Sequence, residues 1–220
     1  MPKLSVKDAT KDDRERAVEP DKTALISIDM QNAEWSEEAE AAARAGGPKA
    51  NKLAYMERIR SVLLPNQTRL QDAARAKGVD VIYTTIEALT LDGRDISLDH
   101  KISGLFHPKG SWEAQIIPAV APKENDILIP KTASGFFNAT NVEYVLRNLG
   151  VEYLVIYGIC TDQCVETTVR DACDRGFLVT LVPDCCAAEE PPRHDRSIDM
   201  MDGHYARVRS TDEVIAELTR

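Results

Sequence analysis

The sequence predicts an α/β protein, built as a three-layer α/β/α sandwich around a six-stranded, mostly parallel sheet. Short runs of aliphatic and β-branched residues alternate along the chain with segments of helical periodicity. Glycines end several helical segments, at Gly78, Gly150 and Gly176, and an apolar run follows each of them. Strands that alternate with helices pair in parallel, because each helix returns the chain to the same end of the sheet. The expected architecture is the Rossmann-like class of open sheets with helices on both faces.

Six segments have the composition of strands. They are short, rich in Val, Ile, Leu, Tyr and Thr, and bounded by polar or turn-forming residues. In chain order they are residues 23–28, 79–85, 127–131, 153–157, 177–182 and 206–209.

Helices are expected between these strands. Ser36 is the expected N-cap of an acidic, alanine-rich helix over residues 36–45, an insertion that is a candidate lid for this chain's own site or a neighbour's. A longer helix starts or kinks at Pro65 and breaks at residues 77–78. The remaining helices are expected at residues 142–149, 165–175 and 194–201, with a last helix capped by Thr211. Residues 87–121 and 132–139 lack periodicity and are expected to be loops, the longer one with short helical pieces.

The size and charge of the chain restrict its partners. It has 220 residues and a formal net charge of −9, so it lacks the basic excess of proteins that bind nucleic acid or anionic membranes. We expect one domain over residues 21–220, preceded by a polar N-terminal arm over residues 1–20. The arm has no apolar core of a signal peptide, and the five cysteines do not form an even-numbered disulfide framework. A cytoplasmic protein with reduced thiols is the expectation.

Three reactive side chains follow expected strands. Asp29 closes the first strand, Lys131 closes the third, and Cys164 lies in the loop after the fourth. Ligands of parallel sheets bind outside the carboxyl ends of the strands, so these residues are expected to converge in one cleft. The trio suits attack of sulfur on a carbonyl carbon: Asp29 takes the thiol proton, Lys131 favours the thiolate, and backbone N–H groups stabilise the oxyanion. Because Cys164 lies between a strand end and a helix start, we expect its thiol to ionise more readily than a free one.

Each of these residues also has an ordinary structural interpretation. A lone cysteine is usually a small packed hydrophobe, an aspartate after a strand is usually a turn or cap residue, and a lysine there usually extends to solvent. Cys160 and Cys164 could together suggest metal ligation, but no second pair of suitably spaced ligands follows. We therefore expect no metal and no cofactor, and Cys173, Cys185 and Cys186 are expected to be structural thiols.

Residues on the loops that leave the same strand ends are candidate substrate contacts. They are Asn32, Trp35, Thr85, Phe136, Phe137 and Gln163. Trp35 and Phe137 are the preferred walls of the site, and Gln163 is a candidate contact for a carbonyl or amide group. His107 and Trp112, in the long irregular loop, are placed to reach the cleft or a neighbouring subunit. His194 and His204 lie near helix ends and are expected at the surface or at an interface.

Three motifs of the chain resemble those of the isochorismatase-like cysteine hydrolases. Residues 29–32 read Asp-Met-Gln-Asn, residues 131–136 read Lys-Thr-Ala-Ser-Gly-Phe, and residues 158–171 are similar to the family's Gly-x-x-Thr-Asp-x-Cys-Val-x-x-Thr-x-x-Asp signature. The resemblance runs from about residue 23 to the C-terminus. It implies the isochorismatase-like hydrolase fold, a catalytic triad of Asp29, Lys131 and Cys164, and a cis peptide bond between Ile159 and Cys160. It also implies an oxyanion hole formed by the backbone N–H groups of Cys160 and Cys164, and we expect a homo-oligomer, a dimer or tetramer.

Two details indicate a branch of this family. Members that hydrolyse the vinyl ether of isochorismate lack the nucleophile where this chain has Cys164, which favours the amidohydrolase branch. Nicotinamidases carry an Asp-x-His-x-His metal site after the second strand, whereas here that region has only the widely spaced His100 and His107. The resemblance therefore favours metal-free enzymes such as ureidoacrylate amidohydrolase, N-carbamoylsarcosine amidase and biuret hydrolase.

The expected function is cysteine-dependent hydrolysis of a C–N bond in a small amide, carbamoyl or ureido compound, through a thioester intermediate. A ureidoacrylate-like substrate is the first choice. The alternatives are an isochorismatase-type ether or ester hydrolase without covalent catalysis, a nicotinamidase-like amidase, and a non-catalytic binding member of the family.

Overall fold

The protein contains a six-stranded sheet in the order β3-β2-β1-β4-β5-β6. A computed structural model describes residues 5–220, so the first four residues of the polar arm lie outside the described part. The strands are β1 (Thr23–Ile28), β2 (Asp80–Ile86), β3 (Ile127–Lys131), β4 (Tyr153–Ile159), β5 (Leu178–Ala187) and β6 (Arg207–Val208). Each pair of neighbouring strands is parallel. The predicted six-stranded α/β fold is therefore confirmed, and β1 and β4, at its centre, are buried along their whole length.

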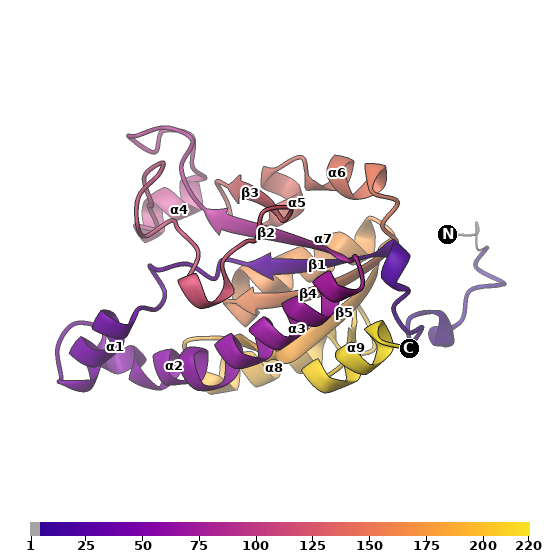
Figure 1. Cartoon of the computed structure of the whole chain (residues 1–220). Helices are drawn as coiled ribbons and strands as arrows, with labels where there is room; N and C mark the ends of the chain where they lie inside the picture. The colour runs from indigo at the N-terminus through magenta and orange to yellow at the C-terminus, as the bar shows by residue number, and fades with distance from the viewer. Residues whose placement is uncertain (1–4) are drawn as a thin grey trace.

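Helices cover both faces of this sheet. They are α1 (Glu37–Arg44), α2 (Leu53–Arg58), α3 (Leu64–Ala76), α4 (Leu98–Ser103), α5 (Phe136–Ala139), α6 (Val142–Asn148), α7 (Glu166–Asp174), α8 (Pro191–Met201) and α9 (Thr211–Leu218). In Figure 1, α3 crosses in front of the sheet and packs against α9, while α7 lies behind the sheet. This placement follows because crossovers between parallel strands are right-handed. The chain adds β2 and β3 on one side of β1 and β4, β5 and β6 on the other, so the connecting helices of the two halves lie on opposite faces of the sheet.

Several element boundaries differ from the sequence expectation. Residues 136–139 form the short helix α5 instead of a loop, and β5 extends to Ala187 because a register shift at Gly158 lets its second half pair with β4. A π-helical turn, Ile59–Leu63, joins α2 to α3, so the helical stretch begins well before Pro65. The cap of α9 is Ser210 and not Thr211: its hydroxyl accepts from the Glu213 N–H while the Glu213 carboxylate accepts from the Ser210 N–H.

The polar arm and the long loop carry short helical turns. Residues 11–13 and 20–22 are 3₁₀ turns, and the Val18 N–H donates to the Glu217 carboxylate at 3.1 Å, which ties the arm to α9. The loop over residues 87–121 contains α4 and the 3₁₀ turn Pro118–Val120, as expected. Within residues 5–220, none of the helices combines the length and the apolar character needed to span a bilayer.

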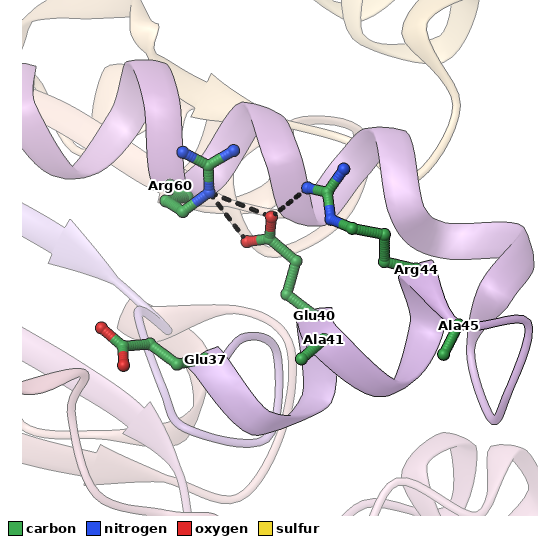
Figure 2. Close-up of a pocket in the computed structure, with 6 residues that line it drawn as sticks. All are labelled: Glu37, Glu40, Ala41, Arg44, Ala45 and Arg60. Carbon is green, nitrogen blue, oxygen red and sulfur yellow. Dashed lines mark hydrogen bonds and ion pairs between the residues drawn. The ribbon is translucent and has the colours of Figure 1, made fainter.

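The helix α1 is fastened to the neighbouring helical stretch by one buried carboxylate. Ser36 caps α1 by accepting from the Ala39 N–H at 3.1 Å. Glu40, only 5% exposed, accepts from Trp35 Nε1 at 2.8 Å, from Arg44 at 2.8 Å and from Arg60 Nε at 3.0 Å. Figure 2 shows both guanidinium groups converging on this side chain beside a cavity of about 450 Å³. The candidate lid is therefore held in one orientation by charge-assisted hydrogen bonds.

Candidate active site

Three residues from separate strand ends meet in the interior of the protein. Lys131 Nζ lies 2.9 Å from Asp29 Oδ2 and 3.4 Å from Cys164 Sγ. Their exposed fractions are 0% for Lys131 and 4% for each of the other two. The strand register explains the convergence, because Ile28 aligns with Thr84 of β2 and with Gly158 of β4, and Ile86 aligns with Lys131.

Asp29 leaves β1 in an unusual backbone conformation. Its φ of 53° lies in the left-handed region, which is uncommon for a residue other than glycine. Its N–H still donates to the Thr84 carbonyl at 3.0 Å, so the chain turns sharply while staying attached to β2. The turn directs the carboxylate toward Lys131, and such conformations tend to occur at functional sites.

Gln31 fastens the ends of β1 and β2 to each other, a role that the sequence analysis did not assign. Its side-chain amide donates to the Ile86 carbonyl at 3.0 Å and accepts from the Ile86 N–H at 2.7 Å. The side chain is 2% exposed. The only sequence signal for this role was the position of Gln31 in the Asp-Met-Gln-Asn motif, two residues after Asp29.

Lys131 is completely buried and yet positively charged. Its ammonium group donates to Cys164 Sγ and to the Ala133 carbonyl at 3.0 Å, and it pairs with Asp29. Burial alone would lower the pKa of Lys131, but the charge of Asp29 and the hydrogen bonds to Asp29 and Cys164 outweigh burial and raise it. Lys131 therefore stays protonated and supplies a fixed positive charge between the carboxylate and the thiol.

The loop that carries Cys164 depends on a close approach of two strands. Gly158 has a φ of 130°, and a Cβ placed on it would lie 2.1 Å from the Ile28 carbonyl oxygen. The peptide bond between Ile159 and Cys160 is cis. The Cys160 carbonyl then accepts from the N–H groups of Gln163 and Val165, which closes the π-helical turn Thr161–Val165 around Cys164 before α7 begins. Only glycine fits at residue 158.

The Cys164 thiol does not ionise easily, contrary to the sequence expectation. Burial is the largest effect and, together with the negative charge of Asp29, raises the pKa of Cys164 to about 12, although Lys131 lowers it. The prediction from helix-dipole position was wrong because it ignored burial and the neighbouring carboxylate. A thiol with so high a pKa is protonated at neutral pH.

The residues expected to bind substrate lie in different surroundings. Asn32 and Trp35 line a cavity of about 330 Å³ together with Trp112, whose backbone carbonyl accepts from Asn32 Nδ2 at 3.0 Å. Thr85 is 1% exposed, near the end of β2, and its hydroxyl has no hydrogen-bond partner among residues 5–220. Gln163 is exposed in the π-helical turn Thr161–Val165.

The two phenylalanines behave differently from the other candidates. Phe136 is completely buried at the start of α5. The Phe137 ring packs 5.8 Å from Phe177 and under the Arg175 guanidinium at 5.5 Å. Phe177 lies just before β5, at the end of the sheet opposite Cys164, so the Phe137 ring packs toward that end and not toward Asp29, Lys131 and Cys164.

His194 is buried beside the π-helical turn Thr161–Val165, so of its two expected positions, at the surface or at an interface, the surface position is wrong. Its Nδ1 lies 2.8 Å from the Thr161 hydroxyl and its Nε2 lies 3.4 Å from an Arg58 nitrogen. Because a guanidinium only donates, Nε2 accepts and Nδ1 carries the proton. His204 is exposed, as expected, whereas His107 is half-buried and burial lowers its pKa.

The described part of the chain lacks a cluster of side chains suited to bind a metal ion. Within residues 5–220, no three or more His, Cys, Asp or Glu side chains are grouped so that they could hold a metal ion. Cys160, considered as a ligand with Cys164, instead contacts the Tyr55 hydroxyl at 3.6 Å.

Comparisons with known proteins identify the family. Residues 23–213 match the model of the isochorismatase domain. Ureidoacrylate amidohydrolase RutB of Rhizobium rhizogenes is 34% identical over 184 residues, which cover 76% of this chain and 71% of that protein. N-carbamoylsarcosine amidase of an Arthrobacter species is 30% identical, over 89% of this chain and 70% of that protein. The crystal structure of a cysteine hydrolase from Pseudomonas syringae superposes with a TM-score of 0.77 at 25% identity, covering 93% of this chain and 95% of that one. With its six-stranded parallel sheet and a domain match over most of its length, the chain belongs to the isochorismatase family of hydrolases.

Proposed function

We propose that this protein is a cysteine-dependent amidohydrolase that cleaves a C–N bond of a small ureido or carbamoyl compound, with a ureidoacrylate-like substrate as first choice. The observation that carries the proposal is the buried chain of contacts from Asp29 through Lys131 to Cys164. Two relatives at 30% identity or more, a ureidoacrylate amidohydrolase and an N-carbamoylsarcosine amidase, support the substrate class. Simple amides and nicotinamide are the alternatives within amide chemistry.

The first chemical step forms a thioester. Cys164 Sγ bonds to the carbonyl carbon while its proton moves to the Asp29 carboxylate, and the backbone N–H groups of Cys160 and Cys164 stabilise the oxyanion. The tetrahedral intermediate then breaks its C–N bond, and ammonia or an amine leaves with the proton from Asp29. The high pKa of Cys164 makes this coupled transfer necessary, because a free thiolate is scarce at neutral pH.

The second step hydrolyses the thioester. Asp29 removes a proton from water, the oxygen bonds to the carbonyl carbon, and the C–S bond breaks as the sulfur regains the proton. Lys131 keeps its charge through both steps and balances whichever neighbour, carboxylate or sulfur, is anionic. In this proposal Asn32, Trp35, Thr85, Phe136 and Gln163 are substrate contacts, and the active species is a cytoplasmic dimer or tetramer.

The test is ammonia release by purified protein from a panel of ureido, carbamoyl and simple amide compounds. We expect turnover by the wild type and loss of at least about a thousandfold in Cys164→Ser, which retains a weaker nucleophile. Cys173→Ser is the matched control, because Cys173 lies in α7 away from the triad. Full activity of Cys164→Ser would refute the covalent mechanism. Activity on a vinyl ether without a trapped thioester in the mass spectrum would favour the non-covalent ether hydrolase instead.

A further inference from the structure

We propose that Tyr55 and Glu34 are positioning residues that hold Cys160, and thereby its backbone N–H, in place for the oxyanion. The inference rests on the proposed function, since it assigns a role in that same site. It concerns two residues outside the catalytic triad, one from the segment after β1 and one from α2.

The three side chains form a chain of contacts behind the nucleophile turn. The Tyr55 hydroxyl donates to Glu34 Oε2 at 3.2 Å, and its oxygen lies 3.6 Å from Cys160 Sγ. Tyr55 is 3% exposed. A phenol has one proton, and here it is directed to the carboxylate, so the Cys160 thiol is the donor to the tyrosine oxygen. The contacts therefore have one direction, from thiol to phenol to carboxylate.

The electrostatics keep Cys160 in the role of a donor. Burial and the negative charge of Glu34 raise the pKa of Cys160 well above its ordinary value, so the thiol stays protonated. A protonated Cys160 can donate to Tyr55, and it does not compete with Cys164 as a nucleophile. Burial also raises the pKa of Glu34, but the nearby positive charge of Lys52 opposes this effect.

The location of the chain connects it to catalysis. Cys160 follows the cis peptide bond and its carbonyl accepts from two N–H groups of the turn that carries Cys164. Its carbonyl is thus held by the turn and its side chain by Tyr55, which leaves little freedom at the Cα to which the N–H group is also attached. An oxyanion donor works only if it is aimed in advance at the developing charge. Loosening the side chain should therefore weaken transition-state stabilisation more than substrate binding.

The test compares kcat and KM in a double-mutant cycle. We expect Tyr55→Phe, which keeps the ring and removes the hydroxyl, to lower kcat about tenfold with KM within about twofold. Cys160→Ala should have a similar effect, and the double variant should be no worse than either single variant, because both changes remove the same interaction. Glu34→Gln retains an acceptor for the phenol and should recover most of the activity that Glu34→Leu loses.

Tyr153→Phe is the matched control. Tyr153 is also 3% exposed and donates to a glutamate, Glu19, at 2.8 Å, but it lies at the start of β4, away from the triad. This variant should keep kcat unchanged. An unchanged kcat in Tyr55→Phe, a change in KM alone, or additive effects in the cycle would overturn the inference while leaving the amidase proposal intact. Absence of turnover in the wild type across the substrate panel would overturn both.

Discussion

Replacing Asp29 by asparagine should make the Cys164 thiol more reactive toward alkylating agents and strongly reduce amide hydrolysis. The two effects have opposite signs because Asp29 is the general base of the proposed mechanism and its charge also raises the pKa of Cys164. In Asp29→Asn the carboxylate disappears while Lys131 stays next to the sulfur at 3.4 Å. The thiolate then has a positive neighbour and no negative one, so its formation becomes easier.

The contacts of Lys131 set the magnitude. Since Lys131 Nζ touches both groups, the Asp29 carboxylate and the Cys164 sulfur lie no more than about 6 Å apart. At an effective dielectric constant of about 20, two unit charges at that separation interact by about 3 kcal/mol, or about two pKa units. Because the pKa of Cys164 lies far above 7, a decrease of about two pKa units in Asp29→Asn should raise the ionised fraction at pH 7 about a hundredfold.

The assay is the rate of iodoacetamide modification of Cys164 at pH 7, followed by peptide mass spectrometry. Cys173 in the same molecule is an internal reference whose rate should not change. We expect modification of Cys164 to be about a hundredfold faster in Asp29→Asn, and amide hydrolysis to fall by at least about a hundredfold because the general base is gone. Equal or slower alkylation in a variant that is folded by circular dichroism would refute the electrostatic assignment.

Three further substitutions test the supports of the site. Gly158→Ala should destabilise the protein by at least about 3 kcal/mol, because the added Cβ would collide with the backbone of the neighbouring strand and alanine is strained at the positive φ. Thermal unfolding compares it with the control Gly176→Ala, also at positive φ but with open space around the Cβ, which should cost about 1 kcal/mol. Glu40→Gln should lower the free energy of unfolding by about 1–2 kcal/mol, because it weakens the charge-assisted hydrogen bonds to Arg44 and Arg60. Glu37→Gln, at an exposed position of the same helix, should lower it by less than about 0.5 kcal/mol, so equal denaturant midpoints of the two variants would contradict the role of Glu40. Burial and the neighbouring Arg58 guanidinium lower the pKa of His194 in the folded protein. The stability that neutral His194 contributes is therefore present above the ordinary histidine pKa of about 6.5 and is lost as the pH falls below it. His194→Gln should flatten this decline of the free energy of unfolding between about pH 7 and pH 5.

Local sequence signals were sufficient for the elements that the chain builds from its own neighbours. The β-branched run before Asp29 and the run that ends at Lys131 became strands with the expected ends. Ser36 caps α1 as expected, because capping needs only a side chain and an N–H three residues later. The last helix was predicted to be capped by Thr211, which was wrong by one residue because the neighbouring Ser210 has the same capping chemistry and forms the cap.

The chemistry at each residue required the tertiary structure. The pKa of Cys164 depends on burial and on Asp29, which lies more than a hundred residues earlier in the chain, and no local pattern contains either quantity. His194 became buried because α8 packs on the nucleophile turn, and Phe137 turned toward Phe177 because α5 faces α7.

The sequence by itself determined the parallel α/β fold and indicated Asp29, Lys131 and Cys164 as candidate site residues, since strand periodicity and motif spacing are local properties. Only the tertiary structure decided that these three residues touch, that the thiol is protonated at rest, and that Tyr55 links Glu34 to Cys160. The physical reason is that distance, burial and electrostatic coupling arise between segments that the fold brings together, and these quantities decide how a side chain reacts.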